Sequence, residues 1–214
     1  MNLNVHGVLK VTTAFLPLIS APGGRVVMVS SGAASMFIGK CSEERLRWFV
    51  DPSVTMDQIQ ALIQEMHDIG SSAEDPSEAF VSAGLTPFSY GFSKAILNSL
   101  TMLLARENPN LKINACSPGF VETDLTRAAF KGGDKTPQEM GMIQPAEGAS
   151  APVFLALGDL PTPPGEGWYF GSDAQRSPLH KYRSPGDPPF DGNLEWDAAS
   201  STFMAGAGVD PEGK

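Results

Sequence analysis

The sequence predicts an α/β fold built on a parallel sheet, and two short segments carry that prediction. Residues 25–31 hold four consecutive apolar residues, and residues 111–116 form a second predicted buried strand. Short apolar runs without alternation are typical of parallel strands that are buried on both faces. Helical patterns precede and separate the two segments, and such alternation is typical of sheets joined by right-handed crossovers.

Apolar residues at helical spacing predict the helices around these strands. A helix over residues 3–19 precedes a turn at residues 22–24, and a longer helix runs from Pro87 to about Glu107. Their apolar positions are Val8, Val11, Phe15, Leu18 and Ile19 in the first and Ile96, Leu97, Leu100, Leu103 and Leu104 in the second. Residues 137–157 are also predicted to be helical, with a restart near Pro145, and residues 167–171 form a third predicted short strand.

Residues 32–88 interrupt the alternation and are expected to form a helical insertion. Ser42 and Thr55 each precede acidic or amide side chains, which indicates helix starts at both positions. Between Gly70 and Glu78 the chain becomes polar, which indicates a loop. We therefore expect an insertion of one or two helices with a mobile end.

Composition divides the chain into two parts. Residues 1–171 carry the helix and strand patterns and are expected to form one domain, whereas residues 172–214 are rich in Pro, Gly, Asp and Ser. Residues 183–189 contain three prolines and cannot form regular structure. Residues 199–214 are expected to be disordered.

The overall composition excludes several classes of function. A net charge of −9 argues against a nucleic-acid surface and an anionic-membrane surface. The two cysteines, Cys41 and Cys116, argue against a disulfide framework and fit a reducing compartment. Three scattered histidines predict no metal site. No apolar run is long enough to span a bilayer, and the first residues lack the basic start of a signal peptide, so we expect a cytoplasmic protein.

The motif that carries chemistry is Tyr90-x-x-x-Lys94, at the start of the long helix. Residues four apart share a helix face, so the phenol and the ammonium can point into one cleft. A nearby ammonium stabilises phenolate and lowers the pKa of a tyrosine below about 10. Such a phenol can transfer a proton to a carbonyl oxygen. Taken alone, however, this spacing is nearly always a surface pair.

Hydroxyl and turn residues follow both predicted strands. Ser30 and Ser31 end the first strand, and Pro118 and Gly119 follow the second. In parallel α/β sheets the ligand binds beyond the carboxyl ends of the strands. We therefore expect these residues to border one crevice.

Four segments, in this order, resemble the short-chain dehydrogenase/reductase family. They are residues 4–7 (Asn-Val-His-Gly), 29–31 (Val-Ser-Ser), 90–94 (Tyr-Gly-Phe-Ser-Lys) and 117–123 (Ser-Pro-Gly-Phe-Val-Glu-Thr). The match covers roughly residues 2–171. The resemblance implies a Rossmann-like doubly wound parallel sheet, and an NAD(P)H-dependent oxidoreductase that reversibly reduces a ketone or aldehyde to an alcohol.

The resemblance assigns catalytic roles to four residues. Tyr90 is similar to the general acid of the family, and Lys94 to the residue that lowers its pKa and binds the nicotinamide ribose. Ser31 resembles the hydroxyl that holds the substrate oxygen and stabilises its developing charge. Asn4 resembles the asparagine that holds a water in a proton relay with the lysine.

The resemblance also implies a nicotinamide cofactor, with NADP (NADPH) favoured over NAD. Tyr90 and Lys94 would contact the cofactor. The loop after the second strand would pack on the nicotinamide and contact its carboxamide, through residues similar to Pro118, Gly119, Val121 and Thr123.

Several of these assignments leave an alternative open. Ser30 competes with Ser31, although the family pattern favours the second serine. Asn4 could instead have no role beyond capping a helix. Asn2 is a competing candidate for the same role, although the spacing to Gly7 selects Asn4. Thr123 could be a simple turn hydroxyl.

The long separation between Ser31 and Tyr90 resembles the monomeric carbonyl reductase branch. An insertion at this place would cover a helix face that other members use to form oligomers, so we expect a monomer. Alternatively, the insertion could lie at the edge of the substrate cleft and have no effect on oligomeric state. The expected substrate is a small lipophilic carbonyl compound, and the apolar candidates for its pocket wall are Leu125, Phe130 and Met142.

The resemblance does not extend to the N-terminal cofactor-binding half of the family. No Gly-x-x-x-Gly-x-Gly turn follows a strand near the start, although such a turn usually holds the pyrophosphate. The expected sheet is therefore partial and the chain truncated. The alternative function is then a non-catalytic family member that binds a partner through its uncovered sheet and helix surface. A family epimerase or dehydratase is disfavoured, because the Pro-rich tail is too short for a substrate domain.

Overall fold

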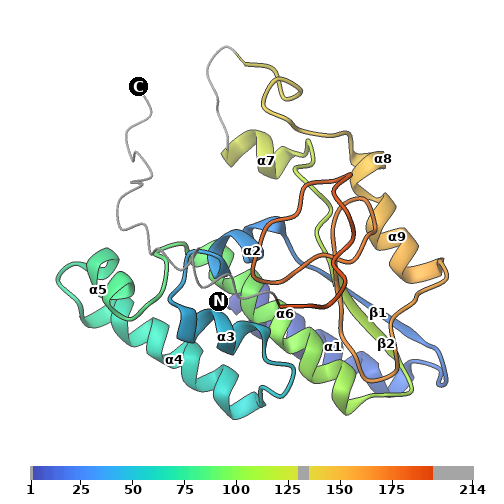
Figure 1. The fold of residues 1–214 in the computed structure, drawn as a ribbon, viewed down its shortest axis with the longest axis horizontal. Helices are drawn as coiled ribbons and strands as arrows, with labels where there is room; N and C mark the ends of the chain where they lie inside the picture. The colour runs from blue at the N-terminus through green and yellow to red at the C-terminus, as the bar shows by residue number, and fades with distance from the viewer. Residues whose placement is uncertain (1, 130–134, 195–214) are drawn as a thin grey trace.

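The computed structural model describes residues 2–129 and 135–194, in which helices pack on both faces of a parallel sheet (Figure 1). The strands are β1 (Arg25–Val29), β2 (Lys112–Cys116) and β3 (Tyr169–Phe170). They pair in the order β1-β2-β3, all parallel. The predicted α/β class is confirmed, and each strand lies within its predicted range.

Alternate residues of β1 pack into different layers. Met28 belongs to an apolar cluster with Leu97 and Leu104 of helix α6 (Ser89–Glu107), on one face of the sheet. Val27 packs on the other face, against the cluster that contains Leu155 of helix α9 (Ser150–Leu157). This two-sided burial is what a parallel strand requires, and it explains why β1 has no polar alternation.

Helix α6 lies at the centre of the molecule and is buried over most of its length. One side packs on the sheet, and the other side carries Phe92, Ile96 and Leu100 into the cluster formed by the insertion helices. The five apolar positions predicted for this helix are all buried. A helix enclosed on both sides holds its first turn in a fixed place, and that turn carries Tyr90.

The insertion between β1 and α6 contains more helix than predicted. It comprises α2 (Gly32–Ile38), α3 (Glu43–Val50), α4 (Met56–Ser72) and α5 (Pro76–Ser82). Both predicted starts are confirmed, because the Ser42 hydroxyl accepts a hydrogen bond from Arg45 N–H, and Thr55 forms a capping box with Gln58.

The predicted loop between Gly70 and Glu78 is wrong for most of its length. Helix α4 continues to Ser72, and α5 begins at Pro76 after a short connection. The Asp75 carboxylate accepts hydrogen bonds from the N–H groups of Ser77 and Glu78. A polar segment with an Asp cap and a following proline can therefore start a helix.

The predicted N-terminal helix is present as three consecutive helical segments of different type. A π-helical turn (η1, Asn2–Gly7) leads into α1 (Val8–Phe15) and a 3-10 turn (η2, Leu16–Leu18). Its apolar positions are only partly covered: Val8 and Ile19 pack against an apolar cluster on the sheet, whereas Phe15 is 60% exposed and Leu18 76%. Within the described residues, β1 is the edge of the sheet and no further strand covers this side.

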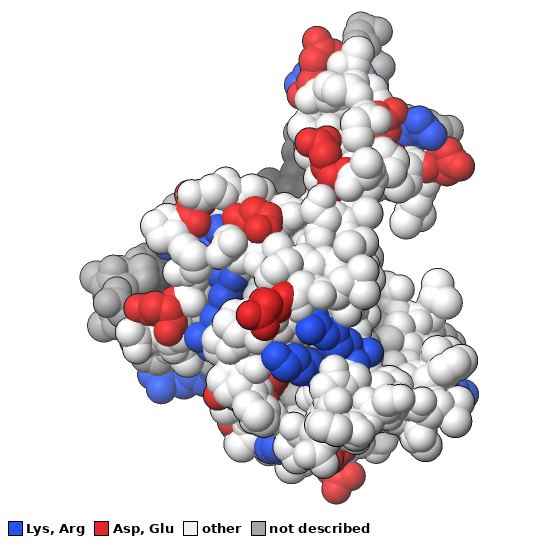
Figure 2. All heavy atoms as spheres, turned by 90° about the vertical axis from the view of Figure 1, so that its right-hand side faces the viewer, with Lys and Arg blue, Asp and Glu red and all other residues white. Residues whose placement is uncertain are grey.

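The chain after β2 leaves the sheet, forms helix α7 (Asp124–Ala129) above the strand ends and returns through α8 (Pro145–Gly148) to α9 (Figure 1). The helix predicted from residue 137 begins only at Pro145, because residues 137–141 form turns and Gly141 adopts a positive φ of 81°. Figure 2 shows α7 and its neighbouring turns projecting at the top, with acidic and basic side chains interspersed on this face.

Residues 172–194 contain no helix or strand, as the prolines predict, but they fold back across the carboxyl ends of β2 and β3 (Figure 1). Backbone hydrogen bonds from Gly171 N–H to Gln175 and from Phe190 N–H to Arg176 hold these turns together. Residues 199–214, for which disorder is predicted, lie outside the described part.

Candidate active site

Ser31 lies at the carboxyl end of β1 and caps helix α2. Its hydroxyl oxygen accepts a hydrogen bond from Ala33 N–H at 3.2 Å, and its side chain is partly exposed. A serine that accepts in this way still has its own O–H free to donate. Ser30, by contrast, is buried and donates its hydroxyl to the Lys94 carbonyl at 3.3 Å.

Tyr90 and Lys94 lie one turn apart at the start of α6. The Lys94 Nζ atom lies 5.8 Å from the centre of the Tyr90 ring and donates a hydrogen bond to the Val29 carbonyl at 2.9 Å. Burial lowers the pKa of the Lys94 ammonium. Tyr90 is 47% exposed, so its ring remains accessible at this edge of the molecule.

Close packing between α2 and α6 brings the Ser31 and Tyr90 turns together. A Cβ placed on Gly91 would lie 2.8 Å from the Ala33 carbonyl oxygen and 2.8 Å from Phe37 Cβ. Only a glycine at position 91 allows the two helices to approach this closely. The turn that carries Tyr90 is therefore in direct contact with the turn that Ser31 caps.

Asn4 reaches the same helix from the π-helical turn η1. Its Nδ2 atom donates to the Ser93 hydroxyl at 3.1 Å, and that hydroxyl donates to the Tyr90 carbonyl at 2.8 Å. Asn4 therefore does not cap its own helix; it is anchored to the residue next to Lys94. Asn2 begins the same turn.

The loop after β2 is joined to the Ser31 turn through Ser117. Its hydroxyl oxygen accepts hydrogen bonds from Gly32 N–H at 3.1 Å and from Gly119 N–H at 3.2 Å. Gly119, which follows Pro118, has a φ of 89°, which favours glycine. A Cβ there would lie 3.0 Å from Ile143 Cδ1.

The end of this loop forms bonds of its own. Val121 forms an isolated parallel bridge with Ile143. The Thr123 hydroxyl lies 3.1 Å from the Thr126 hydroxyl and accepts a hydrogen bond from Thr126 N–H at 3.3 Å, in the first turn of α7. These are the contacts of a turn hydroxyl, and Thr123 remains exposed.

Three residues were expected to form an apolar pocket wall. Leu125 is exposed on α7, Met142 is buried, and Phe130 lies outside the described residues. Neither Leu125 nor Met142 lines the cavity at the strand ends described next.

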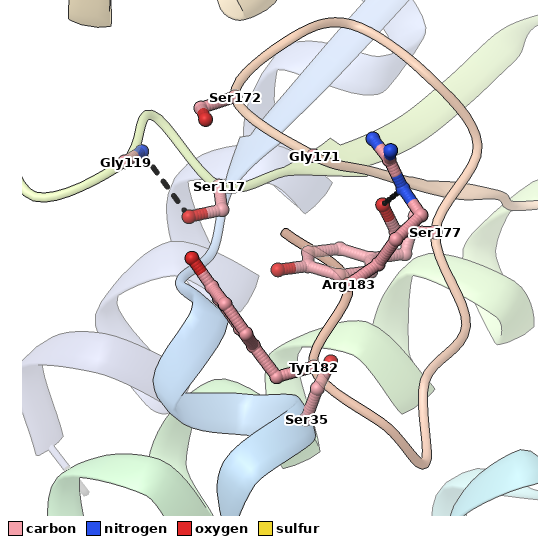
Figure 3. A pocket seen from close by; sticks show the side chains of 9 residues that line it. Ser35, Ser117, Gly119, Gly171, Ser172, Ser177, Tyr182 and Arg183 are labelled. Carbon is pink, nitrogen blue, oxygen red and sulfur yellow. Dashed lines mark hydrogen bonds between the residues drawn. The ribbon is translucent and has the colours of Figure 1, made fainter. Parts of the chain in front are cut away.

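A small polar cavity at the strand ends was not predicted from the sequence. Its volume is about 20 Å³, and Figure 3 shows its lining side chains converging from the loop after β2, from α2 and from the C-terminal turns. The lining residues are Ser35, Ser117, Gly119, Tyr169, Gly171, Ser172, Ser177, Tyr182 and Arg183. Burial raises the pKa of Tyr169, against hydrogen bonds to the Ser117 and Ser35 side chains. The small residues Gly32, Ser35 and Gly39 on one side of α2 were the available signal that another segment packs there.

Both cysteines are buried thiols, although Cys41 was placed in a polar stretch by its sequence. Burial raises the pKa of Cys41 to about 11 and that of Cys116 to about 12. In residues 2–129 and 135–194, no group of three or more His, Cys, Asp or Glu side chains could hold a metal ion. No helix in this part of the chain has the length and apolar character needed to cross a membrane.

Comparison with known proteins agrees with the resemblance seen in the motifs. No protein-family profile matches the sequence. Short-chain dehydrogenase/reductase 1 of Saponaria officinalis is 33% identical over 171 residues, which cover 77% of this chain and 50% of the relative. NADPH carbonyl reductase 1 of Sus scrofa is 31% identical over 163 residues, which cover 73% of this chain and 50% of the relative.

A solved structure supports the same relationship. Salutaridine reductase from Papaver somniferum superposes with a TM-score of 0.57 at 26% identity, covering 77% of this chain and 51% of that structure. The chain spans about half the length of the curated relatives it matches. It belongs to the short-chain dehydrogenase/reductase family, is carbonyl reductase-like within it, and carries a partial Rossmann-like fold.

Proposed function

We propose that this chain carries the catalytic residues of an NADPH-dependent oxidoreductase that reduces a ketone or aldehyde to an alcohol. The observation that carries the proposal is the contact between the first turns of α2 and α6 at Gly91 and Ala33. This contact brings the turn that Ser31 caps next to the turn that carries Tyr90. The relatives named as carbonyl reductases add support, at about half of their length.

In the proposed reaction two hydroxyls hold the substrate oxygen. Ser31 donates its free O–H to that oxygen and stabilises the negative charge that develops there. Tyr90 donates a second hydrogen bond and then transfers its proton. The Lys94 ammonium stabilises the resulting phenolate. When bound, NADPH supplies the hydride, and the protein orients the reactants and polarises the carbonyl.

The described residues fit the nicotinamide end of such a cofactor. Gly119 has a φ of 89°, which favours glycine, and its N–H donates to the Ser117 hydroxyl, so the loop after β2 is held at the strand ends where the nicotinamide would lie. Pro118, Val121 and Thr123 belong to the same loop, and Lys94 offers an ammonium for the ribose hydroxyls. Asn4, anchored to Ser93, is the proposed holder of the water in the proton relay.

The proposal is tested by NADPH oxidation with a small aromatic ketone. Because the relatives are about twice as long, the 214-residue chain is assayed alone and also joined to the N-terminal half of the Sus scrofa relative. We expect ketone-dependent oxidation in the joined protein and its loss in Tyr90→Phe. Full activity in Tyr90→Phe would refute the role assigned to this phenol.

A second candidate function is a binding protein without catalysis. It is favoured by the apolar side chains exposed along the N-terminal helix and the free edge of β1, which are Leu3, Val11, Phe15, Leu18 and Val29. A surface of this kind can bind a partner. NADPH titrated into the 214-residue chain separates the two functions, because a micromolar dissociation constant argues against the binding-protein function. The expected monomeric state is tested by sedimentation in the same buffer.

A further inference from the structure

Residues 177–183, here called the strap, lie along one side of helix α2. The Ser35 hydroxyl donates to the Pro178 carbonyl at 3.1 Å. A Cβ placed on Gly39 would lie 2.8 Å from the His180 carbonyl oxygen, so this glycine leaves room for the strap. Leu179 packs against the apolar clusters on both sides of α6. The strap is therefore seated in the core rather than laid loosely on the surface.

An ion pair closes the end of the strap. Arg183 pairs with the Asp173 carboxylate, and its Nε atom donates to the Ser177 hydroxyl at 3.0 Å. The Arg183 side chain is only 5% exposed. Gly186 N–H donates a further hydrogen bond to the Asp173 carboxylate at 3.1 Å. Buried charge that is paired and hydrogen-bonded in this way fixes the geometry of the turn.

The strap places the Tyr182 ring beside the turn that carries Ser31. A Cβ placed on Gly32 would lie 2.7 Å from Tyr182 Cε2, so the ring packs directly on this glycine. In Figure 3 the phenol oxygen points toward the Ser117 hydroxyl, near Gly119. The cavity beside the ring has room for one water and not for a substrate. Even so, Tyr182 is 46% exposed, so part of its ring is open to solvent.

Exposed aromatic rings gather at this turn from two directions. The exposed Phe, Tyr and Trp residues in the described part of the chain are Phe15, Phe88, Tyr90 and Tyr182. Phe88 and Tyr90 lie with ring centres 6.3 Å apart at the start of α6, where Phe88 also contacts Gly91. Tyr182 lies on the side of Gly32. The Ser31 turn is thus flanked by aromatic rings from α6 and from the strap.

We propose that Tyr182 is a specificity-determining residue of the carbonyl site, whose exposed ring surface packs against an aromatic substituent of the substrate. The assignment rests on the proposed function, because Ser31 and Tyr90 must hold the substrate oxygen. The body of the substrate then extends between the rings at the start of α6 and the ring of Tyr182. Aromatic rings pack on one another in offset or edge-to-face geometry, so aryl ketones and aryl aldehydes are the favoured substrate class.

The kinetic test compares acetophenone with cyclohexyl methyl ketone, which has a saturated ring of similar size. In the NADPH assay, Tyr182→Ala is expected to raise KM for acetophenone about three- to tenfold more than KM for the saturated ketone, the range expected for an aromatic pair. The value of kcat should change little, and Tyr182→Phe should behave as the unchanged protein. Lys181→Ala, on the exposed part of the strap, is the matched control. Equal changes in both KM values would overturn the assignment.

A double-mutant cycle on stability tests whether the Tyr182 ring packs on Gly32. Gly32→Ala collides only with Tyr182 among the atoms near its Cβ, so it should destabilise the chain strongly alone and much less in the Tyr182→Ala background. Gly91→Ala collides with Phe88, Ala33 and Phe37 instead, so Tyr182→Ala should not rescue it. Rescue of both glycine variants, or of neither, would contradict the seating of the ring.

Failure of the proposed function is distinguishable from failure of this inference. If the unchanged protein reduces neither ketone, saturation-transfer NMR of acetophenone with the 214-residue chain still tests whether Tyr182 binds an aryl group. A signal in the unchanged chain and in Lys181→Ala, lost in Tyr182→Ala, would support an aryl-binding surface without catalysis. No signal in the unchanged chain, or equal signals in all three proteins, would refute the inference.

Discussion

The Ser117 hydroxyl oxygen accepts a hydrogen bond from Gly32 N–H at 3.1 Å. The same oxygen accepts from Gly119 N–H at 3.2 Å. One buried hydroxyl therefore joins the turn that carries Ser31 to the loop proposed to pack on the nicotinamide. The spacing between the two halves of the proposed site depends on this shared acceptor.

Replacing Ser117 by alanine should lower the free energy of unfolding by about 1–3 kcal/mol, since it leaves backbone N–H groups without their acceptor. Urea denaturation of the 214-residue chain measures this change. Ser150→Ala, on an exposed position of α9, is the control and should change stability by less than about 0.5 kcal/mol. Equal effects of the two substitutions would contradict the role of Ser117.

The two neighbouring serines at the end of β1 should separate in the activity assay. Ser31→Ala should lower kcat about a hundredfold, because it removes a donor from the developing oxyanion. Ser30→Ala removes a buried bond to the Lys94 carbonyl and should retain most of the activity. Ketone-dependent NADPH oxidation is the measurement, and the reverse order of the two effects would assign the role to Ser30.

Replacement by alanine should change stability in opposite directions at two helical glycines, Gly91 in α6 and Gly70 in α4. Gly91→Ala should destabilise the fold by about 1–3 kcal/mol, because its Cβ meets a backbone carbonyl and Phe37 at 2.8 Å. In Gly70→Ala the Cβ lies at an ordinary 3.6 Å from Phe80, so the higher helix propensity of alanine should stabilise α4 by about 0.5–1 kcal/mol. Thermal unfolding measures both, and a stable Gly91→Ala protein would mean that the helices lie farther apart.

Both thiols should resist alkylation in the folded chain. Burial raises the pKa of Cys116 to about 12 and that of Cys41 to about 11, so little thiolate is present at pH 8. Because the folded pKa values are raised, both thiols contribute stability that is present below pH 9 and is lost as pH rises through the folded values. Reaction with a thiol reagent should be slow until urea unfolds the protein. Rapid reaction in the native chain would show that the thiols are accessible.

The Asp173–Arg183 pair should stabilise the strap in a pH-dependent way. Burial acts to raise the pKa of Asp173, but hydrogen bonds from Arg183, Gly186 and Gln175 outweigh it and lower the pKa. The stabilisation is therefore present above the ordinary carboxyl pKa and is lost as pH falls through the lower folded value.

Asp173→Asn should cost on the order of 1–3 kcal/mol at pH 7, because it weakens hydrogen bonds to a charged group. The difference from the unchanged chain should shrink below about pH 4, near the usual pKa of an aspartate. Denaturation at pH 7 and pH 3 measures it. Asp124→Asn, which changes a fully exposed carboxylate, is the control and should show no such difference. A pH-independent effect of Asp173→Asn would contradict the stabilising role of the Asp173–Arg183 pair.

Local patterns in the sequence were sufficient to predict the strands of the sheet and the long helix α6. The Val-rich run before Ser31 predicts a buried parallel strand, and the spacing of Tyr90 and Lys94 places both side chains near one helix face. The residue types at these positions act through neighbours close in the chain, so one sequence is enough to recognise them. The same holds for the caps at Ser42 and Thr55.

Contacts between distant segments could not be predicted from the sequence. Tyr182 follows a Pro-rich stretch without periodicity, and its place beside Gly32 depends on Arg183 pairing with Asp173 across the turns after β3. The exposure of Phe15 and Leu18 likewise depends on what lies beyond the edge of β1, which helical spacing does not report. Prolines exclude regular structure, but they do not exclude an ordered segment.

The proposed convergence of Ser31 and Tyr90 on one carbonyl oxygen is tested most directly by a single-turnover rate. The joined protein described above is loaded with NADPH and mixed with acetophenone. The oxidation of the bound NADPH is then followed in the unchanged and Tyr90→Phe forms. The rate should fall by about 10²–10⁴-fold in Tyr90→Phe, while the dissociation constant for NADPH stays the same. An equal rate in the two forms, with NADPH bound in both, would show that Tyr90 does not supply the proton.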